Sequence, residues 1–383
     1  MASIRKRKLP SGKTAWQVDY RDAENKRRHK QFATWRKADE WLVKERAQLA
    51  SAHAPAAERL MIGEAGEAWI KDCERNGLER STIEVYEQRL RDHITPFIGD
   101  KKLYEFSTAD AHDFYEALLD RLRSRDMVRR VRINTGAILR YAQQKGWVSK
   151  NVIAVAPYKH SRREKKRPSM PTLREVRSMI DVTADKWRDR LAMLHTLIFC
   201  GLRASELRGL SWPDVDLRSN TMTIRQRADK WGRIGKPKSE AGTRDIPFPS
   251  ALAQELRLWK VRCPPSELDL VFPTSTGTVQ SHANIMNRYF RPMQIQAGIC
   301  HKNESGKENR QTPPTIRAKY GMHALRHFCA SLWIDADYSP KRVQKMMGHA
   351  SIELTFDIYG HLFDGREKIE ESLRKTQERV LAG

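Results

Sequence analysis

The chain has 383 residues, which is room for two or three domains. It carries 71 Lys or Arg against 47 Asp or Glu, a net charge of +24 that indicates a polyanionic partner, most often nucleic acid. The longest apolar run, residues 191–202, is far shorter than the ~20 residues of a membrane span, and the basic N-terminus lacks a signal core. Five scattered cysteines form no disulfide or metal spacing, so we expect a cytoplasmic protein without a membrane partner.

The first fifty residues are the most basic part of the chain, with fourteen Lys or Arg against six Asp or Glu. Alternating apolar and polar residues predict strands near Ile4, over 16–20 and over 27–32, followed by a helix that Thr34 caps. A small sheet with a helix behind it would leave arginines and lysines on its free face, which suits a DNA groove, although an ordinary basic sheet is the alternative. The DNA contacts expected here are Arg5, Lys6, Arg7, Arg27, Arg28 and Lys30.

A linker over residues 51–60 leads into a helical region. Apolar residues at helical spacing predict one helix around Trp69, one capped by Ser81, one capped by Thr108 and one from residue 127 to 142. The four form a small bundle. Basic residues of the last helix would meet phosphates, with a solvated face as the alternative, and the basic linker over 159–168 would follow the DNA backbone. The contacts expected from these two segments are Arg129, Arg130, Arg132, Arg162 and Arg163.

The last part of the chain reads as mainly helical with a small antiparallel sheet. Thr172 caps its first helix with Glu175 in a capping box, and residues 191–199 form its central helix. Strands are expected over 221–224 and 244–248, and helices over 252–259 and 283–295. Residues 300–320 look like a polar insertion of unknown role.

The first of two clusters of candidate site residues directly follows the central helix. Gly201 ends that helix, and Arg203 and Glu206 then lie at i and i+3, so the carboxylate can orient the guanidinium; a surface ion pair is the alternative. Lys238 lies in a turn before the strand that starts at residue 244, where a lysine is ordinarily just solvated.

A second cluster occupies three short helices near the C-terminus. His323 and Arg326 share one face of the first, Gly348 ends the second just before His349, and Tyr359 lies near the end of the third. A guanidinium matches phosphate oxygens, an imidazole holds or moves a proton, and a phenol can be a nucleophile, which together indicate phosphoryl transfer.

Zinc is the alternative at this cluster, since His323 and His327 have the i, i+4 spacing of a helical zinc pair. A zinc site of that kind needs a glutamate beside the first histidine and a third ligand, but Ala324, Leu325 and Arg326 stand between the two. We therefore expect no metal.

The chain resembles the tyrosine recombinases, the phage integrase family. The resemblance is close over residues 165–383 and extends upstream by architecture only; Cys200 and Met347 depart from the usual pattern at positions that are not catalytic. It implies an arm-type DNA-binding domain over 1–55, a helical core-binding domain over 60–158, and a catalytic domain of mixed α/β fold over 168–383 with a C-terminal oligomerisation tail. It also implies a catalytic set with Glu206 in support: Arg203, Lys238, His323, Arg326, His349 and the nucleophile Tyr359.

The activity implied by the resemblance is site-specific recombination in the bacterial cell without metal, cofactor or ATP. Tyr359 would form a 3′-phosphotyrosine bond, His323 could take its proton, and Lys238 would protonate the leaving 5′-oxygen. The implied partners are double-stranded DNA with core and arm attachment sites, three further copies in a homotetramer on DNA, an excision factor and a host DNA-bending protein. The alternatives are a type IB topoisomerase, a chromosome-dimer resolvase and a DNA-binding regulator. The N-terminal module and the tail favour the integrase of a phage or other mobile element.

Overall fold

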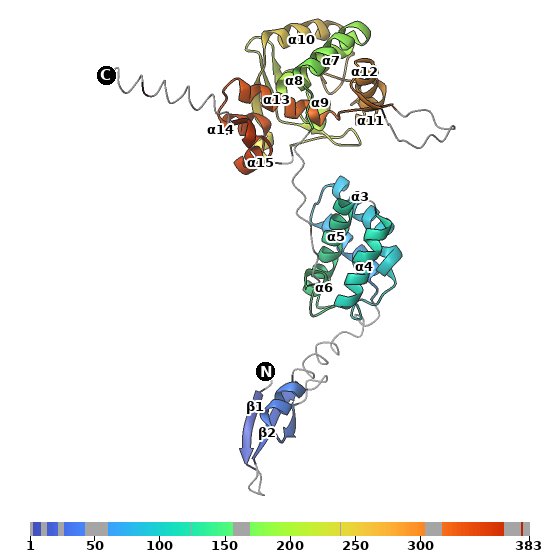
Figure 1. Cartoon of the computed structure of the whole chain (residues 1–383), viewed down its shortest axis with the longest axis vertical. Coiled ribbons are helices and arrows are strands. Elements are labelled where there is room, and N and C mark those ends of the chain that lie inside the picture. The colour runs from blue at the N-terminus through green and yellow to red at the C-terminus, as the bar shows by residue number, and fades with distance from the viewer. Residues whose placement is uncertain are drawn as a thin grey trace. The chain divides into compact units, whose positions relative to one another are not determined.

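Helices make up most of the computed structural model, with small antiparallel sheets between them (Figure 1), as the sequence predicts. The structure describes residues 3–8, 14–21, 27–42, 60–122, 124–155, 169–237, 239–302, 316–363 and 377. The chain divides into two compact units, Met1–Arg162 and Arg163–Gly383. In the described ranges, no helix is long and apolar enough to cross a membrane.

The first unit begins with the predicted three-stranded sheet. Strands β1 (Ser3–Lys8), β2 (Thr14–Arg21) and β3 (Arg27–Phe32) pair antiparallel in that order. A helix over residues 35–42 follows, and the Thr34 hydroxyl accepts a hydrogen bond from the Lys37 backbone N–H at 3.4 Å, which confirms the predicted cap. Val18 of the sheet and two residues of that helix, Ala38 and Leu42, form a small core. Most of the predicted linker, residues 51–59, lies outside the described residues.

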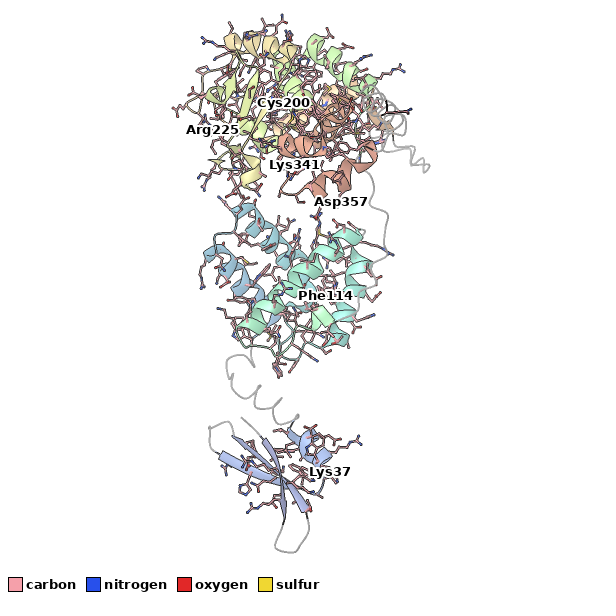
Figure 2. All side chains as sticks on the ribbon, turned by 90° about the vertical axis from the view of Figure 1, so that its left-hand side faces the viewer. Lys37, Phe114, Cys200, Arg225, Lys341 and Asp357 are labelled. Carbon is pink, nitrogen blue, oxygen red and sulfur yellow. The ribbon has the colours of Figure 1, made fainter. Side chains whose placement is uncertain are left out.

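The rest of this unit is a helical bundle with a core of its own, in which Phe114 is buried (Figure 2). Its helices are α2 (Ile62–Arg75), α3 (Arg80–Arg89) with a π-helical continuation Leu90–Gly99, α4 (Thr108–Arg121), α5 (Arg125–Gln144) and the short α6 (Val152–Val155). The four predicted helices are confirmed.

Two of the predicted caps are wrong. Ser81 lies inside the first turn of α3, which Glu79 precedes without a side-chain cap. Thr108 is the first residue of α4, and Ser107 is its cap: the Asp110 backbone N–H donates to the Ser107 hydroxyl at 3.2 Å, while the Asp110 carboxylate accepts from the Ser107 backbone. This reciprocal pair is available only when Ser107 occupies the cap position.

The second unit surrounds the buried helix α8 (Leu191–Cys200), which packs against α7 (Leu173–Lys186), α10 (Ser250–Arg262) and α13 (His323–Asp335). Figure 2 labels Cys200 at the buried end of α8. The predicted capping box of α7 is confirmed, since the Thr172 hydroxyl accepts from the Glu175 backbone at 3.2 Å and the Glu175 carboxylate accepts from the Thr172 backbone at 2.8 Å.

The remaining elements of this unit lie around that centre. One sheet has the order β4 (Val215–Asp216), β5 (Thr221–Ile224), β8 (Arg244–Pro247), and a separate hairpin joins β6 (Arg227–Ala228) to β7 (Ile234–Gly235). The short helix α9 (Ala204–Gly209) follows α8. Helix α11 (His282–Ile285) continues through a π-helical turn, Met286–Phe290, into α12 (Arg291–Gln296). After α13 come α14 (Pro340–Met347) and α15 (Ile352–Phe363).

The stretch predicted as a polar insertion begins and ends in paired strands. β9 (Cys300–Lys302) pairs antiparallel with β10 (Ile316–Ala318). Residues 303–315 between them, the basic linker over 159–168 with Arg162 and Arg163, and all but one residue of the tail beyond 363 lie outside the described residues.

Candidate active site

The end of helix α8 creates one wall of the site. Gly201 has a left-handed conformation with φ of 57°, as the predicted helix end requires. A Cβ at this position would lie 3.0 Å from the Met347 side chain and 3.1 Å from that of Cys329, so any other residue would be strained by its φ and would push these neighbours away. The Gly201 carbonyl consequently points at Arg326 of α13 and accepts from it at 2.7 Å.

Arg326 is held by the carboxyl ends of two helices. Its side chain is only 2% exposed, and its guanidinium donates to the carbonyls of Gly201 after α8 and of Met347 at the end of α14. These carbonyls carry the negative end of each helix dipole, which stabilises a buried cation. Burial, then the charge of Arg203, lowers the pKa of Arg326 to about 9, so the group remains a cation at neutral pH.

Arg203, the residue before α9, also lies at the end of α14. Its guanidinium donates to Glu206 at 2.7 Å, the predicted contact, and to the Gly348 carbonyl at 2.9 Å. Gly348 ends α14 with φ of 63°, and a Cβ there would lie 2.8 Å from the Ala241 carbonyl oxygen. A guanidinium has five N–H donors, so each arginine keeps donors for a ligand beyond these bonds to described residues.

Glu206 is the centre of a buried ion cluster, of which the sequence predicts only the contact with Arg203. Arg244 of β8 donates to both of its oxygens, at 3.1 and 2.9 Å, and also to the Met346 carbonyl at 2.7 Å. Burial acts to raise the pKa of Glu206, but the hydrogen bonds and charge of Arg244, with the charges of Arg203 and Arg326, outweigh burial and lower it to about 2.

This cluster predicts a large loss of stability for Glu206→Gln. The folded pKa of Glu206 lies below its usual 4.5, so its stabilisation is complete above pH 4.5 and falls as the pH drops toward 2. The substitution removes the partner of two arginines and should lower the free energy of unfolding at pH 7 by about 3 kcal/mol. Denaturant unfolding of the variant should also show weaker acid dependence between pH 4.5 and 2 than wild type.

The matched control is Glu255→Gln, which removes the partner of a single half-exposed arginine, Arg188, at 2.5 and 3.1 Å. That change should cost less than about 1 kcal/mol, because the half-exposed Arg188 can still be solvated when its partner is lost. Equal losses for the two variants would contradict a structural role special to Glu206.

Tyr359 on α15 contacts the helix that carries Arg326, α13, through its hydroxyl. The residue is 2% exposed, and its hydroxyl lies 2.7 Å from Nδ1 of His327. Burial raises the pKa of Tyr359 to about 12, partly opposed by the charge of Arg326. In Figure 2, Asp357 marks the helix that carries this tyrosine.

His349 lies beside the tyrosine ring. The two rings are nearly parallel, with an angle of 8° and 6.5 Å between centroids, and Nδ1 of His349 lies 2.9 Å from the Thr355 hydroxyl. Burial, followed by the charges of three arginines, lowers the pKa of His349 to about 3, so this imidazole is neutral at pH 7.

The histidine that contacts Tyr359 differs from the one the sequence favoured. Among the described residues, His327 and not His323 bonds the tyrosine hydroxyl, and the exposed His323 instead sets its ring 4.7 Å from that of His327. Spacing identified His327 only as half of a zinc pair. In the described part of the chain, no group of three or more His, Cys, Asp or Glu side chains could hold a metal ion.

Five of the six predicted catalytic residues therefore meet around one point, although they come from four helices or helix ends: Arg203, His323, Arg326, His349 and Tyr359. The sixth, Lys238, lies outside the described residues. Arg244 was missed, yet a signal for it exists: it alternates with Ile246 along β8, and both face the core.

The predicted DNA contacts of the N-terminal sheet divide between its two faces. Arg7 donates to Gln17 at 2.9 Å and Arg5 lies 3.9 Å from Asp19, in a row on the face away from the helix. Lys6 and Lys30 lie on the other face, over the rings of Trp16 and Trp41 respectively, because strand residues alternate in direction. The expectation that all these cations share the free face is wrong. Arg28 pairs with Tyr20 and so takes the helix side with Lys30, while Arg27 pairs with Arg21 at the end of the ladder.

The three predicted DNA contacts of α5 differ in how exposed their side chains are. Arg129 and Arg130 are exposed and lie 3.5 and 2.7 Å from Asp126. Arg132 instead donates to the Tyr115 hydroxyl at 2.9 Å and to the Ile153 carbonyl at 3.2 Å, so its guanidinium ties α5 to α4 and α6.

Comparison with known proteins places this geometry in a family. Residues 172–366, just over half of the chain, match the phage integrase family, and residues 62–119 match the phage integrase N-terminal SAM-like domain. A tyrosine recombinase XerC-like protein of Caldanaerobacter subterraneus is 22% identical over 334 residues, 79% of each chain. The Tn1549 transposon integrase in complex with circular intermediate DNA has a similar fold, with a TM-score of 0.64 and 18% identity over 83% of this chain and 100% of that one. So does a lambda integrase tetramer bound to a Holliday junction, with a TM-score of 0.58 and 16% identity over 90% of this chain and 95% of that one.

Proposed function

The chain belongs to the phage integrase family and is a tyrosine-type site-specific DNA recombinase, and we propose that it integrates and excises a phage or other mobile element. One observation carries this proposal: two guanidiniums and two neutral imidazoles converge on a buried tyrosine whose hydroxyl is the natural nucleophile. The resemblance in fold to the integrases of a transposon and of lambda supports the assignment to a mobile element.

Arg203 and Arg326 bind the non-bridging oxygens of the scissile phosphate. Both are fixed by backbone carbonyls before DNA arrives, so they stabilise the pentacoordinate transition state without reorganising. His323 and His349 act as neutral hydrogen-bonding groups at the same phosphate. The Tyr359 oxygen bonds to phosphorus and gives its proton to His323, our candidate base, while the bond from phosphorus to the 5′-oxygen breaks.

Lys238 is our candidate for the acid that protonates the leaving 5′-oxygen. The product is a 3′-phosphotyrosine ester and a free 5′-hydroxyl. Because one ester replaces another, the bond energy is retained, and the 5′-hydroxyl of a partner strand can reverse the step and complete the exchange. The steps are all assigned to side chains of this protein, so neither a metal ion nor ATP is needed.

Recombination between two DNA molecules that carry the attachment sites tests this function directly. With purified protein we expect joined recombinant products at full yield in EDTA and without nucleotide. A topoisomerase rejoins the original strands, so relaxation of supercoiled DNA without recombinant products would favour that alternative. A DNA-binding regulator would give neither.

We further propose that the N-terminal sheet binds an arm site separate from the crossover site, through the face that carries Arg5 and Arg7. The double change Arg5→Ala and Arg7→Ala should weaken arm-site binding and reduce the slope of log K against log salt by about 2, since each phosphate contact contributes about 0.9.

Deleting residues 1–50 should leave core-site cleavage intact but abolish integration between full attachment sites.

Arg36→Ala with Lys37→Ala is the matched control, because both side chains are exposed on the helix over 35–42 and the same charge is removed. The control should change arm-site binding less than twofold. Equal effects of the two double variants would mean that net charge, rather than the face bearing Arg5 and Arg7, sets the affinity.

We also propose the roles of the domains, the assembly on DNA and the accessory factors. We assign residues 1–55 to arm binding, 60–158 to core binding and 168–383 to catalysis, in a protein that acts on chromosomal DNA in the bacterial cytoplasm. A homotetramer would form on DNA, with the tail beyond residue 363 docking on a neighbouring copy. An excision factor and a host DNA-bending protein would then set the direction of the reaction.

A further inference from the structure

We propose that His327 is a positioning residue for the nucleophile: its Nδ1 accepts the hydrogen bond of the Tyr359 hydroxyl and thereby fixes the direction of attack. The inference rests on the proposed function, in which Tyr359 attacks DNA. It assigns a role to the one imidazole of the cluster that no part of that mechanism uses.

The contact joins the phosphate-binding helix to the nucleophile helix. His323, Arg326 and His327 lie at i, i+3 and i+4 of α13, so one face of this helix presents both the phosphate-binding groups and the group that holds the tyrosine. The His327 and Tyr359 rings are 5.7 Å apart at 57°, and the 2.7 Å between Nδ1 and the hydroxyl is a short, well-formed hydrogen bond.

The protonation states of the two groups and the tautomer of His327 together determine which group donates. Burial, then the proximity of His323 and Arg326, lowers the pKa of His327 to about 4, so its ring is neutral at pH 7. The pKa of Tyr359 is raised to about 12, so the phenol keeps its proton. A neutral imidazole has one N–H, and we place it on Nε2, so that the hydroxyl donates and Nδ1 accepts. This tautomer leaves the oxygen lone pairs directed away from His327 and free to attack phosphorus.

The same values argue that His327 positions Tyr359 rather than deprotonating it. A base with a pKa of about 4 captures a proton poorly from a phenol with a pKa of about 12. The bond controls instead the rotation of the hydroxyl and of the tyrosine ring, which are the variables that set the approach geometry.

His349 cannot substitute for His327 through the equivalent atom. Its Nδ1 is already 2.9 Å from the Thr355 hydroxyl, and its ring lies parallel to that of Tyr359. Loss of His327 would thus remove the partner that the described residues provide for the tyrosine hydroxyl.

The test compares three substitutions in single-turnover formation of the covalent adduct, using the full chain and a nicked core-site DNA. His327→Ala should slow adduct formation about a hundredfold with unchanged DNA affinity. His327→Asn places an amide oxygen where Nδ1 was and should recover a rate within about fivefold of wild type. His327→Gln places its oxygen one atom further out and should remain at least tenfold slower than the Asn variant.

The wild-type result tests the proposed function, and the results of the His327 variants test the positioning role. If the wild-type chain forms no adduct, the proposed function fails and His327 is irrelevant. If wild type is active and the Ala variant is as fast or faster, His327 does not position the nucleophile. Should the Ala variant fail to fold, the Asn and Gln variants still decide the question, because equal rates for these two would overturn a role specific to Nδ1.

Discussion

Tyr359→Phe is expected to abolish formation of the covalent protein–DNA adduct, by more than about 10⁴-fold, while DNA affinity stays within about twofold. The substitution removes one oxygen atom, and that oxygen is the proposed nucleophile. The phenyl ring remains in place, since Tyr359 is 2% exposed and packs beside His349. The lost bond to His327 should cost only about 1 kcal/mol of stability.

Tyr338→Phe is the control for this loss. Tyr338 precedes α14 and has the Arg342 guanidinium 4.2 Å from its ring centroid, a contact that phenylalanine preserves. Cleavage by this variant should match wild type. An adduct formed by the Tyr359→Phe variant on nicked DNA would show that another residue is the nucleophile.

Arg326→Lys is expected to reduce cleavage by about 10³-fold although the positive charge is retained. The guanidinium fork contacts the carbonyls of Gly201 and Met347 and still offers N–H groups to a phosphate, whereas an ammonium has three donors on one atom. Lysine cannot hold both helix ends and two phosphate oxygens together. We expect the loss in the rate of adduct formation rather than in DNA affinity, because contacts elsewhere dominate binding.

Arg342→Lys is the matched control on α14, at an exposed position. It should leave the cleavage rate within about twofold of wild type. A cleavage rate of Arg326→Lys within tenfold of wild type would contradict the account, since charge alone would then suffice at position 326.

Much of the site follows from local sequence patterns. The sequence predicts helix ends at Gly201 and Gly348, and these ends supply the carbonyls that hold Arg326 and Arg203. The spacing of His323 and Arg326 placed both on one helix face, and the i, i+3 spacing of Arg203 and Glu206 predicted their contact. Each of these features is local to one helix, either its spacing of side chains or the glycine at its left-handed end, and the sequence shows both directly.

The parts that escaped prediction depend on contacts between distant segments. Arg244 meets Glu206 across 38 residues, and His327 meets Tyr359 across 32, so no local pattern names either partner. The cation content of the N-terminal sheet also does not show which face each cation occupies. Ile4 lies on the helix side of β1, so alternation assigns Lys6 to that side too and leaves Arg5 and Arg7 on the free face.

Mapping the covalent linkage tests the central claim most directly. The wild-type chain would be trapped on a nicked core site, digested with protease and nuclease, and sequenced by mass spectrometry. We predict a single modified peptide in which Tyr359 carries a 3′-linked nucleotide. A nucleotide on another residue, such as Tyr320 or Tyr338, or a linkage to the 5′ end of the cleaved strand, would contradict the account.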